Sequence, residues 1–250
     1  VLSKHKGLKG LPVSPYLTLF REEPKKMDLK PLPRPEHPDP YTVLDRRPVY
    51  DSPWIRIRED RFRHRKGAEG RYAVCGFHRT ACGVLALDDE DRVVLVGQWR
   101  YPLEAYSWEL PEGGGDASES PFEAMRRELA EEAGLAARIW EPLAFFHTSN
   151  SSTEEEAFLF LATELSPAEG HQAEDDEELM LHREPFADCL RRVLRGEITD
   201  SLTVVALLAL QARRGGVPTA LDAPLAERFF QRPQDHPAPG RARWESLGLP

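Results

Sequence analysis

A glycine run that leads directly into a strongly marked acidic helix constrains this chain more than any other feature. Residues 109–135 read ELPEGGGDASESPFEAMRRELAEEAGL. Ser120 is a suitable N-cap, a proline follows at the first helical position, and Glu123 completes a Ser-x-x-Glu capping box. Gly134 stands where a left-handed C-terminal cap is expected. The sequence therefore predicts a helix over residues 121–133, preceded by a glycine loop.

Three carboxylates crowd one side of this helix, beside its apolar stripe. Glu128 and Glu132 lie about one turn apart, and on the helical wheel Glu132 falls about 40° to one side of Glu128 and Glu131 about 60° to the other. Like charges at this spacing destabilise an isolated helix by a few tenths of a kcal/mol. A bound cation would reverse that effect, and carboxylates combined with water and substrate phosphates suit Mg²⁺. The alternative is a solvated acidic face on which Arg127 pairs with its neighbours.

The central part of the chain alternates strand-like and helix-like segments. An acidic turn at residues 88–91 separates two apolar runs and predicts a hairpin. The order of elements predicts an α/β or α+β domain with a mixed sheet packed on helices. Strands are expected at residues 54–59, 82–87, 92–97, 142–147, 157–162 and 179–182, and helices at 121–133, 185–195 and 200–213.

Proline-rich ends flank this central domain. Residues 1–40 contain a run of alternating prolines that cannot donate a regular backbone ladder, so they are expected to form an extended arm. Residues 41–215 are expected to form the domain, and residues 216–250 a C-terminal tail. Trp244 is a candidate docking anchor within that tail.

Composition argues against several classes of protein. The formal net charge of −9 disfavours binding to nucleic acid or to an anionic membrane surface. The longest apolar stretch, residues 204–210, is far shorter than the roughly 20 residues of a membrane span. The 3 cysteines show no CxxC spacing, and no secretory signal is recognisable, so a reducing, cytoplasmic setting is expected.

The order of residues in the glycine run and the helix resembles the Nudix box, whose pattern is Gly-x5-Glu-x7-Arg-Glu-U-x-Glu-Glu-x-Gly-U, with U aliphatic. So specific an agreement outweighs the solvated-face alternative. The resemblance implies a Nudix-type α/β/α sandwich with a mixed sheet, and hydrolysis of a nucleoside diphosphate linked to another moiety with Mg²⁺ or Mn²⁺. Every fixed position is matched, by Gly113, Glu119, Arg127, Glu128, Leu129, Glu131, Glu132, Gly134 and Leu135.

The resemblance also implies roles for individual residues. Glu128 and Glu132 would be the main metal ligands, and Glu131 a further ligand or a support for bound water. Arg127 would orient these acids through salt bridges. The backbone carbonyl of Glu112, just before the box, would contact the metal.

The residues ahead of the box resemble the ADP-ribose pyrophosphatase branch of the family. In that branch a Gln-x-Arg-x-Pro strand precedes a Glu-x-Pro-x-Gly turn, and residues 98–102 and 109–113 fit these two patterns. The resemblance implies that Arg100 contacts a substrate phosphate and that Glu109 lies close to the metals. A purely structural salt bridge is the alternative role for Arg100.

The catalytic base in that branch commonly comes from an acidic loop after the box, and residues 174–179 fit that place. Glu177 is the first candidate and Asp175 the second, because a mobile loop can close over the bound substrate. A merely solvated loop is one alternative, and the acidic triplet 154–156 is another source of a base or metal ligand.

The N-terminal strands, within residues 41–80, resemble the dimerising portion of related pyrophosphatases. There Trp54 would stack on the adenine, unless it is a buried core tryptophan. The prediction is a cytoplasmic, homodimeric, Mg²⁺-dependent pyrophosphatase for a nucleoside diphosphate sugar. ADP-ribose, cleaved to AMP and ribose 5-phosphate, is the first candidate.

One departure from the branch leaves the substrate open. A Ser-Pro-Gly sequence often lies beyond the box, whereas residues 147–153 read HTSNSST. GDP-mannose, UDP-glucose and related compounds therefore remain candidates. The further alternatives are a house-cleaning hydrolase of nucleoside triphosphates and a catalytically silent Nudix domain that binds a nucleotide sugar.

Overall fold

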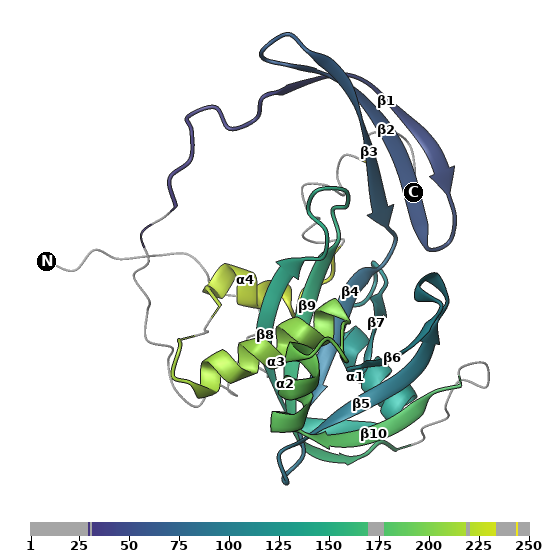
Figure 1. The fold of residues 1–250 in the computed structure, drawn as a ribbon, viewed down its shortest axis with the longest axis vertical. Coiled ribbons are helices and arrows are strands. Elements are labelled where there is room, and N and C mark those ends of the chain that lie inside the picture. The colour runs from purple at the N-terminus through teal and green to yellow at the C-terminus, as the bar shows by residue number, and fades with distance from the viewer. Residues whose placement is uncertain (1–29, 31, 170–177, 219–220, 234–243, 245–250) are drawn as a thin grey trace, which may run out of the picture.

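The computed structural model describes residues 30, 32–169, 178–218, 221–233 and 244 (Figure 1). In this part of the chain, no helix is long and apolar enough to cross a membrane. The strands are β1 (Tyr41–Asp51), β2 (Ile55–His64), β3 (Glu69–Phe77), β4 (Thr80–Ala86), β5 (Arg92–Arg100), β6 (Ala105–Glu109), β7 (Glu112–Gly115), β8 (Leu135–His147), β9 (Glu156–Pro167) and β10 (Met180–Pro185). The helices are α1 (Pro121–Ala133), α2 (Phe186–Leu194), α3 (Ser201–Arg214) and α4 (Ala223–Arg228), with a short 3₁₀ turn, η2 (Tyr101–Leu103).

The strands form three sheets, in the orders β1-β2-β3, β10-β5-β6 and β7-β4-β9-β8. Strands β4 and β9 run parallel, whereas β7 pairs with β4, and β8 with β9, in the antiparallel sense. The expectation of a mixed sheet with packed helices is therefore confirmed.

Two apolar layers lie on opposite faces of the central strands. Successive side chains of a strand point to opposite faces, so Val84 and Phe160 pack in the cluster that includes α1. Leu85 and Leu161 pack in the other cluster, with α2 and α3. Because both faces of β4 and β9 are covered by helices, the central residues of both strands form continuous apolar runs. This is the arrangement of a sandwich, with helices on both sides of the sheet.

The predicted hairpin around residues 88–91 is only partly present. The turn forms, and Leu87 bridges Val93, but β4 and β5 then diverge into different sheets. The reason is that both edges of β4 are already occupied, by β7 on one side and β9 on the other.

The predicted glycine loop is a strand rather than a loop. Residues 112–115 form β7, which pairs with β4 from Gly83 opposite Glu112 to Thr80 opposite Gly115. Helix α1 follows with the predicted capping box, because Ser120 accepts a hydrogen bond from the Glu123 amide at 3.2 Å while Glu123 accepts one from the Ser120 amide at 2.8 Å.

The first sheet, β1-β2-β3, extends away from the remainder of the molecule (Figure 1). The resemblance implied strands within residues 41–80, and β1, β2 and β3 lie there, whereas the residue pattern itself indicated only the strand at 54–59. Strand β6 and helix α4 were not expected. Beyond α3 the chain returns to the core, where Phe229 is fully buried and its carbonyl accepts a hydrogen bond from the Phe122 amide at 3.0 Å.

Candidate active site

A cavity of about 540 Å³ separates the N-terminal sheet from the start of the sandwich. One wall, here called the aromatic wall, includes Trp54, Ile55 and Phe77. Another, here called the acidic wall, includes Glu109 and Glu112 from the ends of β6 and β7. Arg79, Thr80, Arg100, Gly113, Gly114, Thr148, Glu155 and Asp200 are among the other lining residues.

Arg100 joins the two acids of the acidic wall. Its Nε donates to both carboxylate oxygens of Glu109, at 2.9 and 3.0 Å, and its Nη2 donates to Glu109 and, at 2.8 Å, to Glu112. The hydrogen bond to Glu109 raises the pKa of Arg100, so the guanidinium is a permanent cation. The structural salt bridge considered for Arg100 is therefore present; about a third of the side chain is still exposed, and the residue lines the cavity.

Asp200 is a third acid at this wall, and sequence reasoning missed it. Ligand atoms of Glu109, Glu112 and Asp200 all lie within 4.8 Å of one another. Asp200 is also the N-cap of α3, accepting a hydrogen bond from the Thr203 amide at 2.7 Å. The local signal, an aspartate at a helix start, indicates a cap and not a neighbour of residue 112.

The carboxylate of Glu112 is largely buried next to Glu109 and Asp200. Burial is the main cause that raises its pKa well above the usual value, followed by the negative charges of Asp200 and Glu109. Its Oε2 is buried and has no hydrogen-bond partner within the described part of the chain. A divalent cation would satisfy such an oxygen and relieve the repulsion, so the residues present fit a metal ion.

Two acids of α1 lie directly against β7. Glu132 accepts a hydrogen bond from the Glu112 amide at 2.9 Å. A Cβ added at Gly113 would stand only 2.2 Å from Oε1 of Glu128. Glycine at this position therefore leaves the space that the Glu128 carboxylate occupies, and the box acids meet the strand that carries Glu112.

Arg127 makes the salt bridges that the resemblance implied. Its Nη1 donates to Glu128 at 2.9 Å and to Glu131 at 2.7 Å. Its Nε and Nη2 donate to the two oxygens of Glu119, at 3.0 and 3.1 Å, and the bond to Glu119 is the main cause that raises the pKa of Arg127. The arginine thus ties the start of the box to its acidic helix.

Trp54 is not a core residue. Its side chain is 64% exposed and lines the cavity, so the alternative of a buried tryptophan is wrong. The guanidinium carbon of Arg79 lies 5.4 Å from the centre of its ring. Arg79 was not expected at the site from the sequence. Its side chain explains why residue 114, which is not a fixed position of the box, is a glycine: a Cβ on Gly114 would be 2.7 Å from the Cβ of Arg79.

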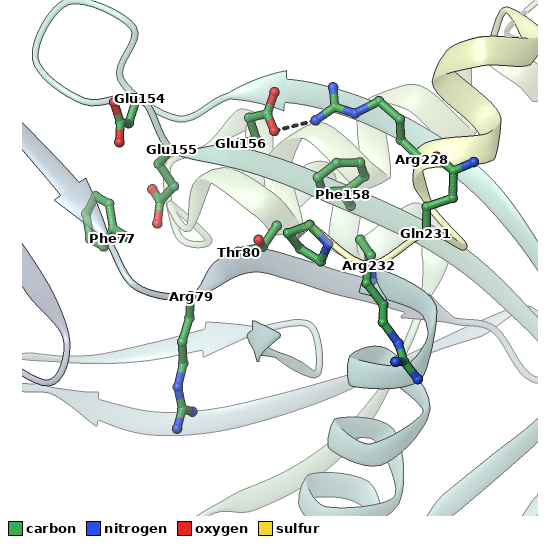
Figure 2. Close-up of a pocket in the computed structure, with 12 residues that line it drawn as sticks. Phe77, Arg79, Thr80, Glu154, Glu155, Glu156, Phe158, Arg228, Gln231 and Arg232 are labelled. Carbon is green, nitrogen blue, oxygen red and sulfur yellow. Dashed lines mark hydrogen bonds and ion pairs between the residues drawn. The ribbon is translucent and has the colours of Figure 1, made fainter. Parts of the chain in front are cut away.

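The acidic triplet 154–156 lines part of a second, smaller cavity of about 60 Å³ (Figure 2). Glu156 pairs with Arg228, and Glu154 approaches two arginines of β2. Glu155 lines both cavities and accepts a hydrogen bond from the Thr148 hydroxyl. Burial raises the pKa of Glu155. Of the triplet, Glu155 is therefore the member that reaches the larger cavity.

The first two candidates for the catalytic base, Glu177 and Asp175, lie outside the described residues. The chain leaves that segment into β10, whose Met180 pairs with Gly97 of β5. Strand β5 ends at Arg100, so β10 begins beside the strand that carries this cavity residue.

Comparison with known proteins agrees with this geometry. The NUDIX domain model matches residues 77–193. An ADP-ribose pyrophosphatase of Mycobacterium tuberculosis is 36% identical over 160 residues, which cover 62% of this chain and 75% of that protein. An ADP-ribose pyrophosphatase of Bacillus subtilis is 35% identical over 137 residues, which cover 54% of this chain and 74% of that protein.

A solved structure shares the fold. The crystal structure of an ADP compounds hydrolase superposes with a TM-score of 0.64 at 22% identity, covering 77% of this chain and 100% of that one. The chain belongs to the Nudix family. Nudix hydrolases use divalent metal ions, and the acids around Glu112 are suited to hold one.

Proposed function

We propose that this protein is a Mg²⁺-dependent Nudix pyrophosphatase that hydrolyses ADP-ribose to AMP and ribose 5-phosphate. The observation that carries the proposal is a single cavity with an exposed tryptophan on one wall and an acidic cluster on another. A nucleotide sugar has the matching parts, since a base stacks on an aromatic ring and a pyrophosphate needs its charge neutralised. Two relatives named ADP-ribose pyrophosphatase support the choice of substrate.

The metal would be held by Glu128 and Glu132, with Glu131 and the backbone carbonyl of Glu112 as further contacts. A bound Mg²⁺ neutralises phosphate oxygens and lowers the pKa of a coordinated water; Mn²⁺ is expected to substitute. Arg127 keeps the carboxylates of Glu128 and Glu131 oriented through the salt bridges described above.

Arg100 is proposed to bind a phosphate of the substrate. Its guanidinium is held by Glu109 and Glu112 and still lines the cavity. A planar guanidinium suits bidentate contact with phosphate. Glu109 fixes its direction, and Trp54 would stack on the adenine.

The base that activates water is proposed to be Glu177, with Asp175 second. Glu155 is the competing residue, because it lines the cavity and burial raises its pKa, which strengthens it as a base. Single substitutions of the three by glutamine or asparagine separate them. The true base, when replaced, removes the acidic limb of the pH–kcat profile, and the other two replacements leave that limb in place.

The protein is proposed to act as a cytoplasmic homodimer through the sheet β1-β2-β3. Large apolar side chains are exposed on these strands, which supports an interface. The three cysteines carry free thiols, which is consistent with a reducing, cytoplasmic setting. Light scattering on the purified protein decides the oligomeric state, and a monomer at micromolar concentration would contradict the dimer. The exposed side chains are Tyr41, Val43, Val49, Tyr50 and Tyr72.

The decisive experiment is a hydrolysis panel with Mg²⁺ in which products are identified. It contains ADP-ribose, ADP-glucose, GDP-mannose, UDP-glucose and a nucleoside triphosphate at equal concentrations. AMP and ribose 5-phosphate from ADP-ribose are the expected products. Faster turnover of GDP-mannose or UDP-glucose would reassign the substrate, and release of pyrophosphate from the triphosphate alone would replace the proposal by a house-cleaning activity.

Glu132→Gln is the control that links activity to the box. Replacing even a supporting residue of a metal site typically costs about 10–100-fold, so loss of a ligand should lower kcat at least about 100-fold. The amide oxygen of glutamine can still accept the hydrogen bond from the Glu112 amide, so the fold should persist. Glu90→Gln, on an exposed turn, is the matched control and should retain wild-type activity. Near-normal activity of Glu132→Gln would refute the metal assignment.

A further inference from the structure

Trp244, near the C-terminal end of the chain, is fully buried against the N-terminal sheet. The guanidinium carbons of Arg56 and Arg58 lie 4.4 and 4.6 Å from the centre of its ring. A Cβ added at Gly76 would stand 2.8 Å from ring atoms of the indole. Arg56, Arg58 and Gly76 thus form a site shaped to the indole, here called the tryptophan slot.

Electrostatics favours an aromatic ring in this slot. Arg56 and Arg58 lie two residues apart on one face of β2 and are only 3% and 2% exposed. Glu154 lies 4.0 Å from Arg56 and 3.8 Å from Arg58, and Asp60 accepts a hydrogen bond from Arg58 at 3.0 Å. The electron-rich face of an indole attracts both guanidinium groups in a site that excludes water.

The slot lies behind the aromatic wall of the active-site cavity. Ile55 of β2 pairs with Phe77 of β3, and both line the cavity. The next pair along the two strands is Arg56 with Gly76, which belongs to the slot. Because successive residues of a strand face opposite ways, Trp244 packs on the back of the backbone whose front forms the aromatic wall.

Within the described part of the chain, polar contacts tie this sheet to the loop that precedes β9. The Cys75 amide donates to the Ser152 carbonyl at 2.9 Å, and the Tyr72 hydroxyl donates to the Ser151 carbonyl. Both reach the loop between β8 and β9 and not the strands of the sandwich. Glu154, which approaches the slot arginines, belongs to the same loop. Trp244 adds a buried apolar contact on β2 and β3, at Gly76, the residue next to Cys75, from which one of these polar links starts.

We propose that Trp244 is a positioning residue that holds the aromatic wall in its substrate-binding arrangement and thereby sets the affinity for the nucleotide part of the substrate. The identity of that substrate rests on the function proposed above. Without the indole, a smaller fraction of molecules would have the wall in place, and KM would rise in inverse proportion to that fraction. The box acids and Arg100 lie on other elements, so kcat should change little.

Four variants test this: Trp244→Ala, Trp244→Phe, Gly76→Ala and the double variant Gly76→Ala/Trp244→Ala. For Trp244→Ala we expect faster amide hydrogen exchange in residues 54–58 and 74–77. If the competent fraction falls to about one tenth, KM rises about tenfold, with kcat within about twofold of wild type. Trp244→Phe should be intermediate.

The Gly76 variants test whether the indole acts through the slot. Alanine is acceptable in a strand, so Gly76→Ala should act only by pushing the indole out and should reproduce the effects of Trp244→Ala. The double variant should be no worse than Trp244→Ala, because the group with which the new Cβ collides is gone. Leu194→Ala, an exposed residue on α2, is the control and should match wild type in exchange and kinetics.

The outcomes separate this proposal from the proposed function. Wild-type exchange in residues 54–58 and 74–77 of Trp244→Ala would overturn the positioning role, as would a fall in kcat at unchanged KM or faster exchange throughout α1 and α3. If the wild-type protein hydrolyses no nucleotide sugar, the proposed function fails. Hydrogen exchange, with AMP binding measured by calorimetry, then decides the positioning role alone. Weaker AMP binding by Trp244→Ala and Gly76→Ala would support it, and equal binding would overturn it.

Discussion

Single residues set how closely the parts of the acidic wall approach. Gly113 has room only for a hydrogen where Glu128 lies, and a Cβ on Gly114 would stand 2.7 Å from the stem of Arg79. Two neighbouring glycines therefore admit two side chains of opposite charge, one on each side of β7. Thr203 fixes the same region from another direction, since its hydroxyl accepts a hydrogen bond from the buried Leu110 amide at 2.9 Å.

Gly113→Ala should disable the metal site without unfolding the strand. The new Cβ would collide with the Glu128 carboxylate at 2.2 Å, so that carboxylate must move. We expect Mn²⁺ affinity, measured by electron paramagnetic resonance, to fall about 10–100-fold. Gly215→Ala is the matched control, because its Cβ would make only ordinary contacts at 3.4 Å, and its affinity should be unchanged. Wild-type affinity of Gly113→Ala would show that Glu128 is not a ligand.

Glu155→Gln should change how stability depends on pH. Burial raises the pKa of Glu155 in the folded state, so the folded protein binds this proton more tightly than the unfolded chain does. The carboxyl group therefore contributes stability below its unfolded pKa, and that contribution is lost as the pH rises through the folded pKa. Glutamine has no charge to bury. The free energy of unfolding of the variant minus that of wild type, measured by urea denaturation, should therefore be more positive at pH 8 than at pH 4.

The neighbouring Glu156→Gln is the control for that experiment. Glu156 pairs with Arg228, so removing its charge should destabilise the protein at pH 8. If the free energy of unfolding had the same pH dependence in Glu155→Gln and in wild type, burial would impose no cost on the ionised form of Glu155.

At the scale of elements, local signals decided helices and longer-range pairing decided strands. Helix α1 begins and ends as its capping residues predict, because a cap involves atoms within a few residues. Strand β7 was expected as a loop, because glycines have no local preference for a strand and it is pairing with β4 that orders them. Strand β6 and the divergence of β4 from β5 likewise depend on partners far along the chain.

Helix α3 illustrates an element that positions the site. Thr203→Val keeps the shape of the side chain but leaves the Leu110 amide without its acceptor in a fully buried place. Such a group costs about 1–3 kcal/mol, which should appear in urea denaturation. Thr203→Ser keeps the hydroxyl and should recover most of the loss. If both variants were as stable as wild type, the bond between α3 and the acidic wall would carry no energy.

At the scale of the whole molecule, the sandwich and the active site are stabilised by different interactions. The two apolar clusters on the faces of β4 and β9 contain none of the acids of the site. Those acids are neutralised in part by Arg100 and Arg127. We therefore expect the fold to persist without a metal ion, whereas the proposed reaction requires one.

Removal of metal by a chelator should accordingly abolish hydrolysis and leave the protein folded. We expect the circular dichroism spectrum to be unchanged and the Tm to rise when Mg²⁺ is restored, because a ligand of the native state stabilises it by mass action. Activity should return with Mg²⁺ or Mn²⁺. Cooperative unfolding on chelation would contradict this division, and full activity in the chelator would refute the metal-dependent reaction.

The class of fold, the acidic helix and the family could all be predicted from local patterns in the sequence. Continuous apolar runs in the central strands indicate a sheet buried between helices. The box residues are close in sequence, so a regular helix and its caps place them without help from the remainder of the chain. The exposed position of Trp54 was one of two alternatives that the sequence left open.

Three contacts could not be predicted in this way: Asp200 with Glu112, Arg79 with Trp54, and Trp244 with β2 and β3. The partners in the first and last of these contacts are separated by long stretches of chain. In each case the local sequence accounts for something else: a helix cap, a strand end or a residue in a tail. Such contacts depend on how the sheets and helices pack, and packing is a property of the folded chain as a whole and not of any one segment.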